Sequence, residues 1–258
     1  LKQVEDAQTP GWEKEIIIVD DCSRDGTRDI LKGYESRMKV IYQDKNGGKG
    51  TAVKRGLSEA TGEYALIQDA DLEYNPAEIK DLLGPVNNGS ADVVYGSRNL
   101  HPVKRSGFFI SRFGVWLITK LINVLYRLKL TDVWTCYKLF PREAGPDFTG
   151  GHFESELLFT AALARRGYRF TEVAISHNPR SIEEGKKIRY RDGMHAIWVI
   201  IFDRLLHLKK KEKRQAKNTK QIIVCPVCKG NLSFSKKGYV CAKDGNFPID
   251  MSGRPFLI

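Results

Sequence analysis

A short apolar run that ends in two carboxylates constrains this chain more than any other stretch of its sequence. Residues 64–67 are Tyr-Ala-Leu-Ile, and Asp69 and Asp71 follow within four residues. A glycine precedes the run and an Asn-Pro pair follows it, so we predict a buried parallel strand. Ligands of open α/β sheets bind beyond the carboxyl ends of strands, where Asp69 and Asp71 can converge on one hard cation, Mg²⁺ or Mn²⁺. The alternative interpretation is a polar turn in which Asp71 caps a helix starting near Pro76.

Apolar runs and helical patterns alternate along the first hundred residues. This alternation predicts an α/β fold with a mainly parallel sheet and helices on both faces. Three of the strand ends carry polar groups, and such groups gathered on one rim of a sheet make a ligand site. The groups are Asp20 and Asp21, Asp69 and Asp71, and Ser97 and Arg98. Strands are predicted at 15–20, 40–42, 64–67 and 91–95, and helices at 27–34, 51–60 and 76–86.

Two further segments have the composition of phosphate-binding loops. Residues 46–50 are Asn-Gly-Gly-Lys-Gly before a helix, which suits close approach of a phosphate to Lys49, although the spacing is not that of a P-loop. Residues 178–189 are polar and positively biased, and they suit either a mobile lid with phosphate donors or a plain exposed loop.

Two apolar helices and a basic run raise the question of a membrane surface. Residues 108–130 and 194–208 are rich in large apolar side chains, and residues 209–220 hold seven Lys or Arg against one Glu within a net charge of +11. The helices suit either the core or a membrane interface, and the run suits a linker, anionic lipid or nucleic acid. Nucleic acid is the weaker partner because the run lacks interleaved aromatic residues. No apolar run is long enough to cross a bilayer, and no signal peptide is visible.

The five cysteines fall into two groups. Cys22 and Cys136 stand alone, and we expect both to be buried small hydrophobes. Cys225, Cys228 and Cys241 have the spacing of metal ligands rather than of disulfides, which fits a reducing compartment.

Several ordered motifs together resemble family 2 inverting glycosyltransferases of the GT-A fold, a Rossmann-like α/β fold. More narrowly, they resemble synthases of the dolichyl-phosphate or polyprenyl-phosphate mannose and glucose type. The resemblance covers about residues 1–208. The motifs are Val19-Asp20-Asp21-x-Ser23-x-Asp25-Gly26-Thr27, Asn46-x-Gly48-Lys49-Gly50, Asp69-Ala70-Asp71-Leu72, Gly96-Ser97-Arg98, Ser111-Arg112, Thr131-Asp132-x-x-Thr135-Cys136-Tyr137-Lys138 and Glu183-Glu184-Gly185-Lys186-Lys187-Ile188.

The resemblance implies a role for each matching residue. A nucleotide-sugar would be bound by Asp20, Asp21, Lys49, Asp69, Ala70 and Asp71. The divalent metal would be held by Asp69 and Asp71, with Glu73 nearby. The acceptor phosphate would be bound by Arg98 and Arg112, with Arg180 and Lys186 or Lys187 supplied by the lid. Asp71, Arg98 and Arg112 would be the residues that carry the chemistry.

The reaction implied is transfer of one sugar from GDP-mannose or UDP-glucose to a polyprenyl or dolichyl phosphate. A phosphate monoester is largely dianionic near neutrality because its second pKa is ~6, so no general base is required. We expect a cytoplasmic protein attached peripherally to the cytoplasmic face of the membrane. The alternatives are a glycan or another lipid as acceptor, or an inactive transferase that serves as an interaction module.

The family opens with an apolar strand, and that strand is expected to be missing here. Residues 1–7 are expected to be the tail of the first helix.

The last 38 residues, 221–258, follow a different pattern. They resemble a Trm112-like zinc-ribbon module, in which Cys225, Cys228, Cys241 and, at the incomplete second knuckle, Asp244 would hold Zn²⁺. The alternative is a degenerate ribbon without metal. We therefore predict a transferase domain at 1–208, a basic linker at 209–220 and a small β module at 221–258, through which a protein partner could dock.

Overall fold

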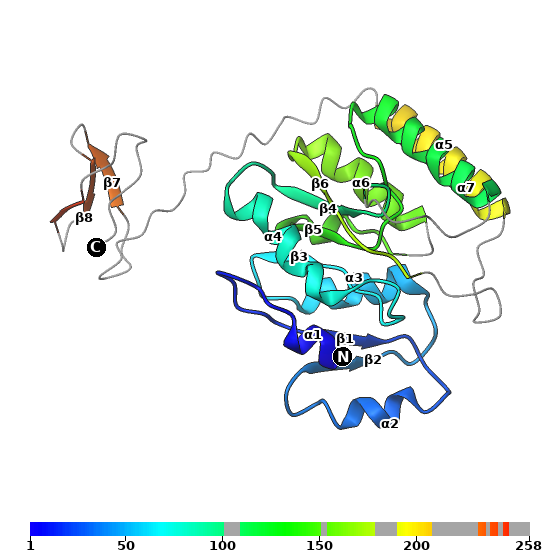
Figure 1. Ribbon diagram of the computed structural model, residues 1–258, viewed down its shortest axis with the longest axis horizontal. Helices are drawn as coiled ribbons and strands as arrows, with labels where there is room; N and C mark the ends of the chain where they lie inside the picture. The colour runs from blue at the N-terminus through cyan, green and yellow to red at the C-terminus, as the bar shows by residue number, and fades with distance from the viewer. Residues whose placement is uncertain are drawn as a thin grey trace. The chain divides into compact units, whose positions relative to one another are not determined.

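The computed structural model describes residues 1–100, 109–150, 154–178, 190–207, 232–235, 238–241 and 245–247. The chain divides into two compact units, Leu1–Lys213 and Arg214–Ile258. Strands and helices alternate through the first unit (Figure 1), as the sequence predicts. Its elements are α1 (Lys2–Asp6), β1 (Ile17–Asp20), α2 (Thr27–Lys32), β2 (Lys39–Tyr42), α3 (Lys49–Glu59), β3 (Tyr64–Leu66), η1 (Pro76–Glu78), α4 (Ile79–Asn87), β4 (Val93–Ser97), α5 (Phe109–Tyr126), β5 (Lys138–Pro141), η2 (Arg142–Asp147), α6 (Glu154–Arg166), β6 (Phe170–Ala174) and α7 (Tyr190–His207).

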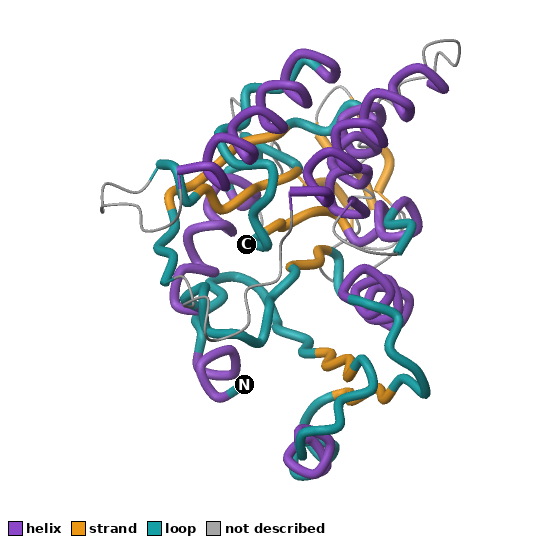
Figure 2. The backbone as a smooth tube through the Cα atoms, turned by 90° about the vertical axis from the view of Figure 1, so that its right-hand side faces the viewer, coloured by secondary structure: helices purple, strands orange, loops and turns teal. Residues whose placement is uncertain are grey.

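The strands of this unit form two sheets among the described residues. The smaller sheet pairs β1 with β2 in parallel, and the larger has the order β3-β5-β4-β6. Figure 2 shows the small sheet below the large one. In the large sheet β5 runs antiparallel to both neighbours, while β4 and β6 are parallel. The expected α/β class is confirmed, but the expectation of a mainly parallel sheet is only partly met, because β5 reverses the direction at its centre.

Helices cover both faces of the large sheet, as predicted. Along β4, Val93 and Tyr95 belong to the hydrophobic cluster that contains α5, α6 and α7 residues, whereas Val94 belongs to the cluster that contains α4 residues. Successive strand residues point to opposite faces, so each cluster marks one face. All five residues of β4 are buried, which places the best-packed part of the core around the central strands.

A glycine is required where β4 meets its neighbours. A Cβ at Gly96 would lie 2.9 Å from side-chain atoms of Ile175 and from Cβ of Tyr137. Any larger residue would therefore push the β4–β6 and β4–β5 pairs apart at the end of β4 that leads to Arg98.

The helix after β3 begins with a cap at Asn75. Its side-chain Oδ1 accepts a hydrogen bond of 3.0 Å from the backbone N–H of Ala77. The alternative interpretation of Asp71 as the cap of this helix is therefore wrong, because Asn75 holds that position.

The second unit contains a three-stranded antiparallel sheet of β7 (Leu232–Ser235), β8 (Gly238–Cys241) and β9 (Gly245–Phe247). Of the predicted zinc ligands, only Cys241 lies in a described strand, and its side chain is not described. Cys225, Cys228 and Asp244 lie outside the described residues. The zinc-ribbon hypothesis stays a prediction.

Candidate active site

The candidate site lies on the rim of the large sheet where β3, β4 and β6 end. Both β3 and β4 are antiparallel to β5, so they run in the same direction and finish at the same rim. Because β5 runs the opposite way, the residues that precede it, 132–137, reach this rim as well. Asp69 follows β3, Arg98 follows β4, and Cys136 comes just before β5. Three distant stretches of sequence thus meet at one place.

Lys49 joins Asp69 to a buried carboxylate. Its Nζ lies 2.8 Å from Asp69 Oδ2 and 2.8 Å from Glu156 Oε1. The second carboxylate oxygen of Glu156, Oε2, lies 2.7 Å from Nζ of Lys138, whose side chain is fully buried. We call Asp69, Lys49, Glu156 and Lys138 the Lys49 network.

The charges of this network stabilise one another. Burial alone would lower the pKa of the Lys49 ammonium, but the charges of Glu156 and Asp69 outweigh burial and raise it above its ordinary value. Burial would likewise raise the pKa of Glu156, yet Lys138 and Lys49 lower it to about 2. Lys49 and Glu156 are therefore both charged at neutral pH.

Cys136 is buried, as expected, whereas Cys22, which was also expected to be buried, is only half-buried. The surroundings of Cys136 are polar. Its Sγ lies 2.5 Å from Lys49 Nζ and donates a hydrogen bond to Asp69 Oδ2. Burial and the charge of Asp69 raise the pKa of the Cys136 thiol, so it remains protonated as a donor. The sequence contained the motif that holds Cys136 but gave no sign that β5 would run antiparallel, which is what brings the thiol to Asp69.

Arg98 is held by a carboxylate that the sequence analysis did not assign. Arg98 Nε and Nη2 donate to the two oxygens of Asp132 at 2.7 and 2.8 Å, and Nη2 also donates to the carbonyl oxygen of Trp134 at 3.0 Å. Burial would raise the pKa of Asp132, but the hydrogen bonds and charge of Arg98 lower it. This fork-to-fork pair fixes the guanidinium plane and leaves Nη1 outside these bonds.

The turn after β3 carries Asp71 and Glu73. Asp71 Oδ1 accepts a 3.1 Å hydrogen bond from the backbone N–H of Glu73, and Glu73 Oε2 lies 3.1 Å from His177 Nε2. His177 follows β6, and the sequence analysis did not single it out. Its ring also packs against Tyr74, with 5.5 Å between ring centroids. Glu73 follows β3 and His177 follows β6, the two edge strands of the large sheet, and the two side chains meet at the same rim.

Asp20 and Asp21 hold loops in this structure. Asp20 is buried and accepts a 2.7 Å hydrogen bond from Arg28 Nε. Asp21 accepts hydrogen bonds of 2.7 Å from the backbone N–H groups of both Gly47 and Gly48. Gly48 has a φ of 79°, which favours glycine, and it leads directly into Lys49 at the start of α3. Asp21 thus fixes the loop that presents Lys49; contact of either aspartate with a nucleotide stays a prediction.

The remaining predicted site residues are not described at the side-chain level. Arg112 lies within α5, but its side chain is not described, and Arg180, Lys186 and Lys187 lie outside the described residues. Their roles at an acceptor phosphate stay predictions. Ala70 lies in the turn between Asp69 and Asp71.

The carboxylates at this rim fit a hard divalent cation whose coordination shell is completed by the substrate. No cluster of three or more His, Cys, Asp or Glu groups suited to a metal occurs among the described residues. Asp69 and Asp71 supply carboxylate oxygens, and Mg²⁺ or Mn²⁺ is commonly bound by one or two carboxylates with waters and substrate phosphates. The pair therefore fits a cation that arrives with a nucleotide better than a closed protein cage.

Sequence comparison places these features in a known family. The profile of glycosyl transferase family 2 matches residues 1–145. The chain is 41% identical over 86 residues to the teichuronic acid biosynthesis glycosyltransferase TuaG of Bacillus subtilis, covering 32% of this chain and 33% of TuaG. It is 40% identical over 90 residues to a dolichol-phosphate mannosyltransferase of Pyrococcus furiosus, covering 34% of this chain and 25% of that enzyme. The chain thus spans a third or less of the length of these two relatives.

Structural comparison agrees on the fold. Glucosyl-3-phosphoglycerate synthase from Mycobacterium tuberculosis, solved with Mn²⁺, UDP and glucosyl-3-phosphoglycerate, is similar with a TM-score of 0.54 at 17% identity, over 78% of this chain and 73% of that one. At this identity the likeness concerns the fold alone, and it supports the GT-A type of α/β architecture. With a family profile that matches more than half of its length, this chain belongs to glycosyl transferase family 2.

Proposed function

We propose that this chain transfers a single sugar from a nucleotide-sugar, GDP-mannose or UDP-glucose, to a polyprenyl or dolichyl phosphate at a membrane surface. The observation that carries the proposal is the gathering of Asp69, Asp71 and Arg98 on one rim. Two carboxylates suit a metal-bound diphosphate, and an arginine suits a phosphate acceptor. Membership of family 2 supports transfer from a nucleotide-sugar, and the Pyrococcus relative is named as a dolichol-phosphate mannosyltransferase.

The chemistry proposed needs positioning rather than a general base. An oxygen of the dianionic acceptor phosphate attacks the anomeric carbon while the bond from that carbon to the donor's diphosphate breaks, and the electron pair leaves with the nucleoside diphosphate. Attack from the opposite side inverts the anomeric centre. Arg98, steered by Asp132, would bind the acceptor phosphate together with Arg112, and Asp69 and Asp71 would hold Mg²⁺ or Mn²⁺. The cation, when bound, neutralises charge that develops on the diphosphate.

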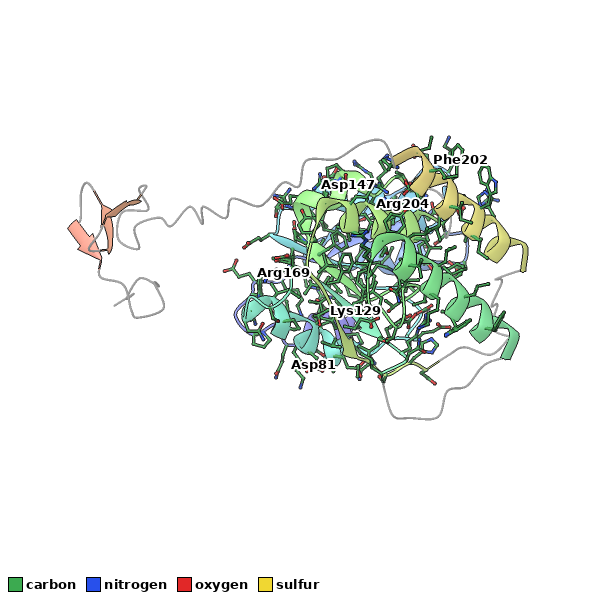
Figure 3. All side chains as sticks on the ribbon, turned by 90° about the horizontal axis from the view of Figure 1, so that it is seen from above. Asp81, Lys129, Asp147, Arg169, Phe202 and Arg204 are labelled. Atoms are coloured by element: carbon green, nitrogen blue, oxygen red, sulfur yellow. The ribbon has the colours of Figure 1, made fainter. Side chains whose placement is uncertain are left out.

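An exposed apolar surface supports a lipid acceptor. Tyr126 of α5 donates to Asp203 of α7, and the two helices pack side by side (Figure 1). Figure 3 shows Phe202 on the outer side of α7. Two aromatic pairs stack on this surface, Phe113 with Trp116 and Trp198 with Phe202. We call the exposed large apolar residues of these helices the α5–α7 face: Phe113, Trp116, Leu117, Val124, Trp198, Ile201, Phe202, Leu205 and Leu206.

This face suits contact with a bilayer surface. Its exposed neighbours Lys120, Arg127 and Lys129 are all basic, and the basic run 209–220 follows α7 in sequence. Apolar and aromatic side chains with basic flanks bind the interface of anionic bilayers. Among the described residues, no helix combines the length and apolar character that crossing a membrane requires. From the apolar face and its basic neighbours we propose peripheral attachment, on the cytoplasmic side.

The proposal extends to the organisation of the chain. A transferase domain at 1–208 would be joined by the basic linker 209–220 to a module at 221–258 that docks a protein partner, with Zn²⁺ as a structural ion. Deleting 221–258 should then reduce activity, stability or partner recovery; a deletion variant unchanged in all three would contradict the docking role.

A transfer assay tests the main proposal. Purified chain is incubated with polyprenyl phosphate in detergent, with GDP-mannose, UDP-glucose or UDP-N-acetylglucosamine, and with Mn²⁺, Mg²⁺ or chelator. We expect a lipid-linked sugar from one donor, formed only with metal and lost in Arg98→Ala. Transfer to a neutral glycan or lipid that survives Arg98→Ala would favour the alternative acceptor. Absence of metal-dependent nucleotide binding would favour the interaction module.

A further inference from the structure

Lys49 places an ammonium group beside one of the carboxylates proposed to bind the divalent cation. Its ammonium lies 2.8 Å from Oδ2 of Asp69, one of the two carboxylates proposed to bind the metal. The ammonium is also tied to the core, because Glu156 Oε1 is 2.8 Å away and Glu156 is 5% exposed at its side chain. Asp69 therefore has a cation beside it before any metal binds.

Glu156, which anchors this ammonium, is itself held by a second ion pair. Glu156 lies in the first turn of α6 and uses its second oxygen for Lys138, which is fully buried on β5. Separating Lys49 from Glu156 would leave a buried carboxylate with one partner fewer, which is costly in a low-dielectric interior. Lys49 is the first residue of α3, and Asp21 fixes the preceding loop through Gly47 and Gly48. The ammonium is thus held at Asp69 from the backbone side and from the core side.

The charges of the Lys49 network cancel. It contains two carboxylates and two ammonium groups, so the negative charge that Asp69 would offer to a metal is balanced within the network. A divalent cation arriving alone meets a neighbouring positive charge, and repulsion between charges a few ångströms apart is strong away from bulk water. A nucleoside diphosphate brings several negative charges that relieve this repulsion.

We propose that Lys49 is a built-in counter-cation that keeps the affinity of the Asp69–Asp71 pair for a bare divalent cation low, so that metal and nucleoside diphosphate bind together. The inference rests on the proposed function and deepens it, because it assigns Lys49 a role toward the metal as a positioning residue. It also explains why α3 begins with a lysine tied to Glu156 rather than with one directed into solvent. Binding of the two ligands is then coupled, and each raises the affinity for the other.

Binding of Mn²⁺, followed by electron paramagnetic resonance, tests the proposal without any turnover. Wild type, Lys49→Gln, Lys49→Arg and Lys54→Gln are titrated with Mn²⁺ alone and with Mn²⁺ plus UDP or GDP. Lys54 is the matched control, since it lies on the same helix, is exposed and loses the same charge. Lys49→Arg keeps the charge. Thermal unfolding of each variant reports whether the fold is intact.

We expect Lys49→Gln to bind Mn²⁺ alone about tenfold more tightly than wild type, and to gain less from the nucleotide. Lys54→Gln and Lys49→Arg should stay within about twofold of wild type. If Lys49→Gln does not fold, Lys49→Ala, which leaves room for water beside Glu156, carries the same expectation. Equal or weaker Mn²⁺ binding by the folded Lys49 variant overturns the inference, while nucleotide-stimulated Mn²⁺ binding by wild type would still support the proposed function. No Mn²⁺ binding by any variant overturns the inference and removes the metal from the proposed function.

Discussion

Leu72 has a φ of 60° between the two acidic residues Asp71 and Glu73, although it is a branched residue. This left-handed value is rare outside glycine, asparagine and aspartate, and strained backbone of this kind concentrates at functional sites. The strain has a visible result, because the turn directs the backbone N–H of Glu73 to Asp71 and the Glu73 side chain to His177. The conformation of one residue thus sets the positions of the two acidic side chains beside it.

Removing the charge of Asp71 should abolish most transfer with little loss of stability. We expect Asp71→Asn to lower kcat/KM by about 100-fold or more, because a neutral amide binds a divalent cation poorly and leaves the departing diphosphate less stabilised. Steady-state transfer rates, measured at a saturating acceptor concentration while the nucleotide-sugar is varied, give this kcat/KM. Asp81→Asn on the exposed surface of α4 (Figure 3) is the control and should behave as wild type. Activity of Asp71→Asn within twofold of wild type would remove Asp71 from the site.

At the scale of elements, the apolar runs predicted β1 to β4, and the helical patterns predicted α2 to α5 and α7. These elements are local, since their patterns depend on neighbouring residues alone. The sequence did not predict β5, which has four residues, ends in Pro141 and pairs with strands far away in sequence. For the same reason it did not predict the contacts of Cys136 with Asp69 or of Asp132 with Arg98. The motifs showed which residue types the site contains. They did not show which of these residues contact one another, because those contacts depend on the direction of β5.

Gly96 gives a test of packing at the centre of the large sheet. Gly96→Ala should lower the free energy of unfolding by about 1–3 kcal/mol, since its Cβ would overlap Ile175 and Tyr137. Gly114→Ala, inside α5 with nothing within 4 Å of the added carbon, should raise it by about 0.5–1 kcal/mol through helix propensity. Urea denaturation of both variants measures the difference. A neutral Gly96→Ala would mean that β4 and β6 adjust easily.

The whole molecule carries a buried ionic network whose stabilisation should depend on pH. Glu156 has a folded-state pKa of about 2 against an ordinary value of 4.5, so its stabilisation is complete above about pH 4.5 and lost as pH falls toward 2. We expect the free energy of unfolding of wild type to exceed that of Glu156→Gln by on the order of 3 kcal/mol near pH 6. This difference should shrink steadily as the pH falls from 4.5 toward about 2. Urea denaturation at several pH values measures it, with the exposed Glu63→Gln as control; a difference independent of pH would contradict the prediction.

The α5–α7 face predicts how the whole molecule behaves toward lipid. The double variant Trp198→Ala, Phe202→Ser should bind vesicles of anionic phospholipid at least tenfold more weakly than wild type, because it removes much of the exposed aromatic surface. Vesicle sedimentation at low and high salt measures the binding. Ile30→Ser is a matched control, since Ile30 is 66% exposed on α2, apart from this face. Equal binding by wild type and the double variant would place the membrane contact elsewhere.

The antiparallel insertion of β5 also sets the order in which the molecule can assemble. β3 and β4 are both paired to β5, so they acquire their shared neighbour only after the chain has been made as far as residue 141. Closing loops of this length costs entropy before any pairing is gained, and such non-local pairing slows folding. The edge strand β6 and the helix that carries Glu156 follow later still in synthesis. Lys49 is made before the acidic motif, whereas Cys136, Lys138 and Glu156 are made after it. A nascent chain therefore contains Asp69 and Asp71 well before it contains the thiol that contacts Asp69 or the buried carboxylate that contacts Lys49, so we expect the site to form only late in folding.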